Sequence, residues 1–348
     1  MLYNIILIII VSYLLIELNH HLSIQSPLVL KPIKFRNYLS ESGQKYITWI
    51  EIKNLNKRME VMIPSLKVNP HLVGMLKDEI ININTKIIPL HPDSEKQQHN
   101  EYWHAYIIKS MKSTFVKIEV EFEIKQSAIE KLKCLWLEIE WVNYGPFGSY
   151  TRFDGFVLPN QSNITEEKTS KFNSVEAIKT HILGNLDDPI TILKSYLPKD
   201  YSPSDILTIG ESPLAIMQGK YIDYRAVNAS PLSRLICKGF HPTSSLATAC
   251  GMQTLINISG PTRVIISWLI GGIFKCLGFR GMFYRLAGEQ ARLIDDITGT
   301  TPPYDKSIVL GPKDTKIFCM KASKELNVNV AVVDVNDLGR VKILSTNN

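Results

Sequence analysis

The chain has 348 residues, of which 45% are hydrophobic and 21% are charged, which is a globular composition. This length predicts about two domains, and the composition excludes disorder, collagen and coiled coil as the main state. Lys and Arg number 39 against 33 Asp and Glu, so the formal net charge is +6. That excess is too small for a basic footprint, and no nucleic-acid partner is expected.

Cysteine and histidine spacing argues against a structural zinc site or a disulfide scaffold. The five cysteines show no C-x-x-C pair, and the eight histidines include no H-x-x-x-H or H-E-x-x-H. Reduced thiols are therefore expected. The cysteines are Cys134, Cys237, Cys250, Cys276 and Cys319.

The N-terminal residues predict a membrane segment. Residues 1–16 are apolar except for Asn4 and Ser12, close to the lower length limit for a span. No basic residue precedes this run and no convincing cleavage site follows it, so a retained anchor over residues 1–18 is favoured over a cleaved signal. Lys31 and Lys34 follow the run, and the positive-inside tendency then predicts a single-pass membrane protein with its soluble part in the cytoplasm.

Residues 30–158 are predicted to form an antiparallel β domain. Apolar and charged residues alternate along its strands, which is the period of a half-buried strand. The predicted strands lie at 47–52, 80–90, 116–124 and 135–142. Their glutamates are interpreted as a solvated face, so no catalytic site is expected here. The polar segment 159–172 follows as a linker.

Residues 173–348 are predicted to form a mixed α/β domain, so the chain as a whole is of the α+β or α/β class. The predicted helices are 175–183, 190–196 with Asp188 as N-cap, and 314–326. The predicted strands are 205–210, 308–310 and 328–335. The last two strands and the helix between them read as a βαβ-like unit in which Ile317, Met320 and Leu326 pack inward.

A second apolar run, Val264–Phe274, has eleven residues and is too short to span a bilayer. It is interpreted as a buried core helix. The alternative is an interfacial segment lying on a membrane, with Trp268, Lys275 and Arg280 beside it.

Two acidic segments are candidate metal sites. Residues 293–305 combine Asp295 and Asp296 with threonines, and carboxylates with hydroxyls suit a hard cation such as Mg²⁺. Residues 333–340 follow a buried strand, where ligands commonly bind in open α/β sheets. The candidate ligands there are Asp334, Asn336 and Asp337, with Arg340 for a phosphate or carboxylate. Ordinary turns remain the alternative for both segments.

A third segment, His241–Gly251, is rich in small residues. Thr243 and Ser244 are candidate anion or nucleotide ligands at a helix start, and a tightly packed helix start is the alternative. The chain has no P-loop, no G-x-G-x-x-G and no G-x-S-x-G motif, so no catalytic residue is identified.

Residues 175–345 resemble the coenzyme F-420-0:γ-glutamyl ligase family. Three stretches carry the resemblance in the family's order: Ser204–Lys220, Asp295–Gly311 and Val328–Arg340. Glu211 and Ser212 stand in the first stretch, where the family has nucleotide-binding lysines. In the second, Thr300 lies near the family's metal-binding acid. In the third, Asn336 takes the place of a family Asp, and Asp337 is displaced by one position.

The resemblance implies a GTP- or ATP-dependent ligase that needs Mg²⁺ or Mn²⁺ and forms a homodimer. Such an enzyme phosphorylates a small-molecule carboxylate to an acyl phosphate, which an amino-acid amine then attacks to form an amide. The β region is expected to lie outside this family's core. Two alternatives stay open: a non-catalytic binding or scaffold protein that keeps the ligase-like fold, and a β region that binds lipid or a partner.

Overall fold

The computed structural model describes residues 2–22, 28–40, 43–57, 59–93, 102–145, 148–160, 170–172, 175–279, 281–296, 302–335 and 341–347. The chain forms two compact units. The first comprises Met1–Asn69, Asn84–Glu121 and Ile139–Arg152, and the second comprises Pro70–Ile83, Phe122–Glu138 and Phe153–Asn348. Antiparallel sheets and several helices make this a mixed α+β protein, as the sequence predicts.

Helix α1 (Leu2–Leu22) begins the chain, and its side chains from Tyr3 to Ile16 are largely exposed. Within the described residues, no helix combines the length and the apolar character that a bilayer crossing requires. The physical reason lies in the sequence of α1, where Asn4 interrupts the apolar run and Glu17 ends it short of the roughly 20 residues of a span. The predicted single-pass membrane anchor, and the localisation derived from it, are therefore corrected.

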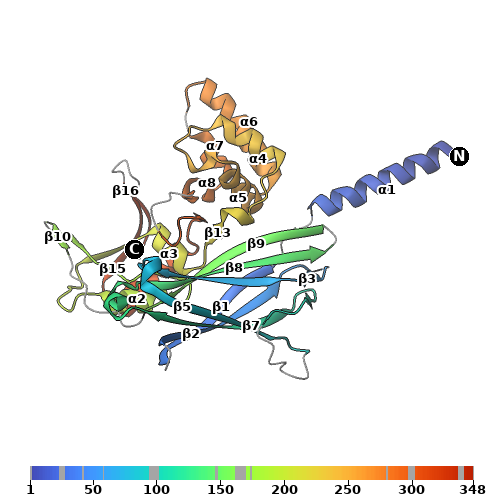
Figure 1. Ribbon diagram of the computed structural model, residues 1–348. Helices are drawn as coiled ribbons and strands as arrows, with labels where there is room; N and C mark the ends of the chain where they lie inside the picture. The colour runs from blue at the N-terminus through green and yellow to red at the C-terminus, as the bar shows by residue number, and fades with distance from the viewer. Residues whose placement is uncertain are drawn as a thin grey trace. The chain divides into compact units, whose positions relative to one another are not determined.

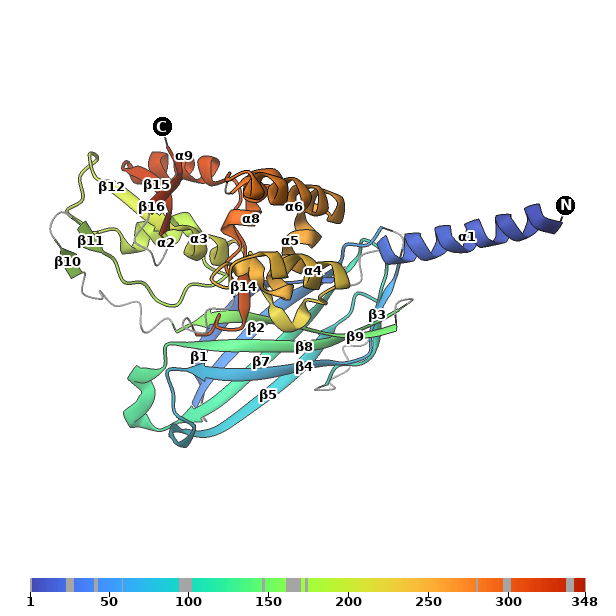
Figure 2. The same ribbon diagram turned by 90° about the horizontal axis from the view of Figure 1, so that it is seen from above.

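The strands before residue 160 form two sheets, which Figure 2 shows. One sheet has the order β1-β2-β7-β5, and the other has the order β4-β8-β3-β6 with β9 paired to β8. The strands are β1 (Leu28–Ser40), β2 (Gly43–Asn54), β3 (Val61–Ile63), β4 (Leu66–Val73), β5 (Ile80–Leu90), β6 (Tyr106–Ile108), β7 (Ser113–Ile124), β8 (Cys134–Gly145) and β9 (Gly148–Pro159). All four strands predicted in this region are therefore confirmed.

Strand β7 shows why the alternating pattern folds this way. Val116, Ile118 and Val120 are buried, as expected for the inward face of a strand with period two. Glu119, on the opposite face, is also buried, because its carboxylate pairs with the ammonium groups of Lys45 at 2.7 Å and Lys117 at 2.5 Å. The prediction of a solvated glutamate face is wrong at this position, since the ion pairs replace the lost hydration.

The second unit carries most of the helices and several short strands, visible in Figure 1. The helices are α2 (Pro189–Tyr196), α3 (Glu211–Met217), α4 (Pro231–Ile236), α5 (Ala249–Ser259), α6 (Pro261–Cys276), α7 (Met282–Ala287), α8 (Gln290–Leu293) and α9 (Thr315–Leu326). The strands are β10 (Ser170–Phe172), β11 (Val175–Ala177), β12 (Ile206–Gly210), β13 (Tyr221–Asp223), β14 (Ser307–Val309), β15 (Asn329–Val335) and β16 (Val341–Thr346).

Two predicted elements of this unit differ from the structure. Residues 175–183 were expected to be helical, but β11 pairs antiparallel with β10 and its hydrogen bonds replace those of a helix. Strand β14 pairs antiparallel with β13, whereas β15 pairs in parallel with β12, so β14, α9 and β15 do not form a βαβ unit within one sheet.

The inward face of α9 also differs from the prediction. Phe318, Ala322 and Leu326 are buried at a spacing of four residues, which is one face of an α-helix. Ile317 and Met320 are exposed, so their predicted inward packing is wrong. Both spacings were compatible with the sequence, and the sheet that α9 covers selects between them.

Helices α4 to α8 form a core of their own and lie together in Figure 1. Met252, Leu255, Val264, Phe283 and Ala287 are among its buried residues. Helix α6 contributes only one side to this core, and the rest of its apolar surface is exposed. The prediction of a fully buried core helix is therefore wrong for the outer side of α6, because the neighbouring helices cover one face alone.

Candidate functional site

Two acidic residues lie at the carboxyl ends of adjacent strands in the three-stranded sheet β12-β15-β16. The parallel register places Gly210 beside Val333, so the next residues along the two strands are Glu211 and Asp334. Glu211 is the first residue of α3, and Asp334 is paired across β15 and β16 with Lys342. The carboxyl ends of parallel strands are where open α/β sheets commonly bind ligands.

A third acid approaches from a different segment. Asp295 forms an isolated bridge with Val309, its N–H donating to the Val309 carbonyl at 2.8 Å and its carbonyl accepting from the Val309 N–H at 2.9 Å. Burial, followed by the charges of Asp334 and Asp295, raises the pKa of Glu211 to about 8, while the charge of Lys342 acts in the opposite direction. The carboxylates of Asp334 and Asp295 therefore both act on Glu211.

The neighbouring Asp296 has different surroundings. Its charge raises the pKa of the Cys250 thiol, after the larger effect of burial, so it lies near α5. Successive residues of an extended segment point to opposite sides, which explains why Asp295 and Asp296 meet different groups. One carboxylate oxygen of Asp296 is buried without a hydrogen-bond partner among the described residues, as is the Oε2 of Glu211.

Four predicted site residues lie outside the described residues, namely Thr300, Asn336, Asp337 and Arg340. Over the part of the chain that the structure describes, no group of three or more His, Cys, Asp or Glu side chains has a metal-binding arrangement. Glu211, Asp334 and Asp295 are thus close enough for the two aspartates to act electrostatically on Glu211 without forming a closed ligand shell. Their carboxylate oxygens are nevertheless the donors that Mg²⁺ and Mn²⁺ prefer.

A cavity of about 620 Å³ begins beside the acidic segment. Its lining includes Thr243, Ser244, Tyr284 and Arg292, together with Ile294, which directly precedes Asp295. The Ser244 hydroxyl and the Tyr284 phenol are 3.0 Å apart, and Arg292 is exposed at the rim. Hydroxyls and a guanidinium converging on a cavity suit an anionic group such as a phosphate or carboxylate.

Helix geometry explains the position of these hydroxyls. The Ser244 hydroxyl also accepts a hydrogen bond from the Leu246 N–H at 3.3 Å, and the Thr248 hydroxyl accepts one from the Gly251 N–H at 3.0 Å at the start of α5. Thr243 is exposed. Ser212, the remaining predicted ligand, is half-buried in the first turn of α3.

Sequence reasoning missed a buried ionic cluster in the second unit. The Arg225 guanidinium donates to the carboxylates of Asp223 and Glu138, both at 2.6 Å, and lies 4.2 Å from the centre of the Phe153 ring. These carboxylates raise the pKa of Arg225. The only sequence signal was the alternation of β8, which predicted an exposed Glu138. That prediction is wrong, because the guanidinium compensates the buried charge.

The fold and this geometry define a class of protein: an α+β chain with an antiparallel β region, followed by an α/β unit with carboxylates at a sheet edge. Residues 29–162 match the family described as F420-0:gamma-glutamyl ligase, N-terminal Ig-like domain. The match therefore gives family-level support for a ligase-like relative. It also corrects the expected location, because it lies on the N-terminal β region and not on the C-terminal half.

Two of the solved structures that this chain matches show only distant similarity. The GAE domain of GGA2p from Saccharomyces cerevisiae is 13% identical, with a TM-score of 0.23, over 40% of this chain and 96% of that one. A family 123 glycoside hydrolase from Clostridium perfringens is 13% identical, with a TM-score of 0.22, over 38% of this chain and 28% of that one. Similarity at this level supports no argument about function. A search of curated proteins returned no match.

Proposed function

We propose that this chain is a ligase-like enzyme that joins a carboxylate to an amine through an acyl phosphate, using a nucleotide and a divalent cation. The observation that supports the proposal is that the charges of Asp334 and Asp295 act on the buried Glu211 and, after burial, help to raise its pKa. The family match over residues 29–162 also supports it, since that family is described as the N-terminal Ig-like domain of a ligase.

In the proposed site, the carboxylates of Glu211, Asp334 and Asp295 would hold Mg²⁺ or Mn²⁺. The fit rests on the chemistry of the donors and on the unpaired Oε2 of Glu211, a buried oxygen that a cation would satisfy. When bound, the cation would neutralise phosphate charge during phosphoryl transfer.

The cavity next to Asp295 would receive the anionic part of a substrate. Arg292 would orient a phosphate or carboxylate with its fork of N–H donors, and the Ser244 and Thr243 hydroxyls would donate further hydrogen bonds.

Thermal unfolding with and without ligands tests the proposal. Mg²⁺ or Mn²⁺ together with GTP or ATP should raise the melting temperature of the full chain, since a ligand at 100 times its Kd adds about 2.7 kcal/mol. Asp334→Asn should weaken this response because it removes one proposed ligand. Glu325→Gln on the exposed side of α9 is the control and should respond like the wild type.

A melting temperature that stays constant at saturating metal and nucleotide would remove the basis of the enzymatic proposal. The non-catalytic scaffold would then be the better interpretation, since the described residues form no ready-made metal-binding group. Release of inorganic phosphate in the presence of candidate carboxylates and amino acids would separate a working ligase from a protein that only binds nucleotide.

A further inference from the structure

The net positive charge of the chain arises in one segment. Residues 226–288 contain no Asp or Glu and six basic residues, and the rest of the chain has 33 basic and 33 acidic residues. The whole formal charge of +6 therefore belongs to this segment. It holds helices α4, α5, α6 and α7, and its basic residues are Arg234, Lys238, Arg263, Lys275, Arg280 and Arg285.

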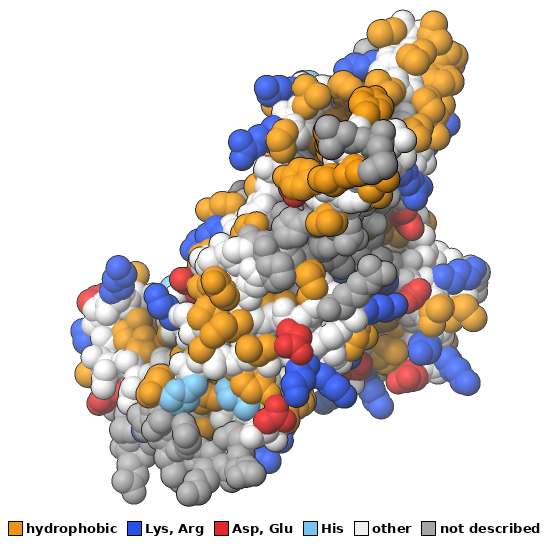
Figure 3. Space-filling view, turned by 90° about the vertical axis from the view of Figure 1, so that its right-hand side faces the viewer, with side chains coloured by type: hydrophobic (Ala, Val, Ile, Leu, Met, Phe, Trp, Pro, Cys, Tyr) orange, Lys and Arg blue, Asp and Glu red, His pale blue; other side chains and the backbone are white. Residues whose placement is uncertain are grey.

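The same segment presents an apolar stripe along α6. Ile266, Leu269, Ile273 and Leu277 are 50%, 53%, 61% and 66% exposed, and their spacing of three or four residues places them on one side of the helix. Val264 and Ser267 face the core of the helical group and are buried. At the top of the view in Figure 3, at the height of α6 in Figure 1, hydrophobic side chains predominate, with Lys and Arg side chains beside them.

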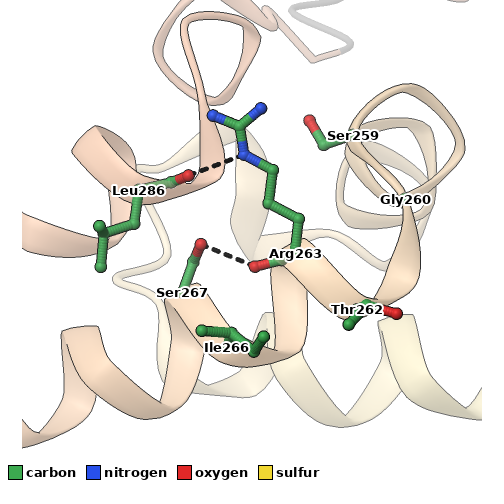
Figure 4. A pocket seen from close by; sticks show the side chains of 7 residues that line it. All are labelled: Ser259, Gly260, Thr262, Arg263, Ile266, Ser267 and Leu286. Carbon is green, nitrogen blue, oxygen red and sulfur yellow. Dashed lines mark hydrogen bonds between the residues drawn. The ribbon is translucent and has the colours of Figure 1, made fainter.

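A cavity of about 480 Å³ lies at the N-terminal end of this stripe. Figure 4 shows Arg263 beside it, with the Nε donating to the Leu286 carbonyl at 2.9 Å and the far end of the guanidinium directed away from that bond. Ser259 and Ile266 line the same cavity. Cationic, hydroxyl and apolar groups are thus adjacent, as recognition of a phosphate attached to an acyl chain requires.

We propose that the outer face of α6, with the basic residues around it, docks onto the surface of an anionic lipid bilayer. The helix lies in the interface with Ile266, Leu269, Ile273 and Leu277 in the headgroup and acyl boundary, and it does not cross the bilayer. Amphipathic helices rich in Lys and Arg bind in this way, by apolar burial combined with attraction to anionic lipids.

The basic residues and the exposed apolar stripe together favour an anionic bilayer as the partner. A nucleic-acid surface would attract the basic residues and leave the apolar stripe without a function. A bilayer with anionic headgroups uses both, because the stripe enters the boundary region while the charges remain at headgroup level. Lys275 is in the last turn of α6, and Lys238 adjoins Gly239, which contacts Trp268 of the same helix.

Sedimentation of the full chain with vesicles tests the proposal. Wild-type protein should bind vesicles of phosphatidylcholine with about 30% phosphatidylserine more strongly than phosphatidylcholine alone, and added salt should weaken the binding. Lys238→Gln/Lys275→Gln should lower the partition coefficient on anionic vesicles about 25-fold, from about fivefold for each charge. Leu269→Ser/Ile273→Ser should lower it about 100-fold.

The matched control is Ile317→Ser/Met320→Ser on α9 of the same unit. These two side chains are 53% exposed each, like Leu269, but they lie outside the cationic segment, so their replacement should leave binding unchanged. All variants carry the same α1, so its exposed side chains contribute equally to every measurement. Equal melting temperatures establish that the variants are folded.

A label at Cys276 locates the contact. Cys276 is exposed at the end of α6, Cys250 is half-buried and the other three cysteines are buried. An environment-sensitive fluorophore on Cys276 should shift its emission to shorter wavelength when anionic vesicles are added.

Three results overturn the proposal: equal binding to both vesicle types, a Leu269→Ser/Ile273→Ser variant that binds like the wild type, or an unshifted emission. Self-association that this variant abolishes, without vesicle binding by the wild type, would assign the surface to a second copy of the chain instead.

Discussion

Replacing Glu211 by Gln tests the carboxylate cluster directly, because it removes one charge and keeps the shape of the side chain. The pKa of Glu211 rises from 4.5 to about 8 in the folded chain through burial and the charges of Asp334 and Asp295. Folding at pH 7 therefore requires proton uptake by a group that would be ionised in the unfolded chain.

The size of the change in the free energy of unfolding follows from the linkage between proton binding and folding. Between the unfolded pKa of 4.5 and pH 7, the shift corresponds to roughly 3 kcal/mol. Glu211 is only half-buried, and solvent screening reduces this to about 1–2 kcal/mol. Glu211→Gln should therefore unfold at higher denaturant concentration than the wild type at pH 7, while losing the stabilisation by Mg²⁺ or Mn²⁺.

The direction of the pKa shift determines how the stability contribution of Glu211 changes with pH. A raised folded pKa makes a contribution to stability that is fully present below pH 4.5 and is lost as pH rises through about 8. The stability advantage of Glu211→Gln should grow over that interval in denaturant titrations, and Glu325→Gln should show no such trend. A variant that is less stable than the wild type at pH 7 to 8, or an advantage independent of pH, would refute the burial and repulsion inferred for Glu211.

Three further predictions concern stability and are measured by chemical denaturation. Arg225→Ala removes the guanidinium that pairs with the buried carboxylates of Asp223 and Glu138 and should cost about 3 kcal/mol, whereas an unchanged midpoint would contradict the ionic cluster. Gly155→Ala places a Cβ 2.0 Å from the Trp136 ring and should cost at least about 1–3 kcal/mol, while Gly272→Ala in open space should be neutral or stabilising. Burial and the charge of His104 lower the pKa of His91 to about 4, so stability should fall between pH 6.5 and 4, and His91→Phe should reduce that loss.

Local sequence patterns predicted the elements whose bounds are set by neighbouring residues. Asp188 accepts a hydrogen bond from the Thr191 N–H at 2.9 Å at the start of α2, as the sequence indicates for an N-cap followed by proline. Strand β5 matches its predicted bounds of residues 80–90. In both cases the residues that define the element are neighbours in sequence.

Distant contacts explain the elements that sequence reasoning missed. Glu138 is buried because Arg225, 87 positions further along the chain, reaches it. Which residues of α9 face inward depends on the sheet it covers, and the exposed side of α6 depends on where α5 and α7 stop covering it.

The candidate site was predictable in composition but not in geometry. Asp295 and Asp334 were identified from their segments, and their common neighbour Glu211 was assigned to nucleotide binding on the basis of a resemblance. Only the register between β12 and β15 shows that Glu211 and Asp334 leave adjacent strands. The sequence could not show that Asp295 and Asp296 have different surroundings, because the difference depends on the bridge between Asp295 and Val309.

The pairing of Gly210 with Val333 makes the acidic edge sensitive to changes in length. Removing one residue from β15 would reverse the facing of every later side chain and turn Asp334 away from Glu211, although each amino acid of the site would still be encoded. Single-residue deletions along β15 should therefore be far more damaging to the proposed cation binding than substitutions at the same positions. Insertions or deletions in loops elsewhere in the unit should be tolerated.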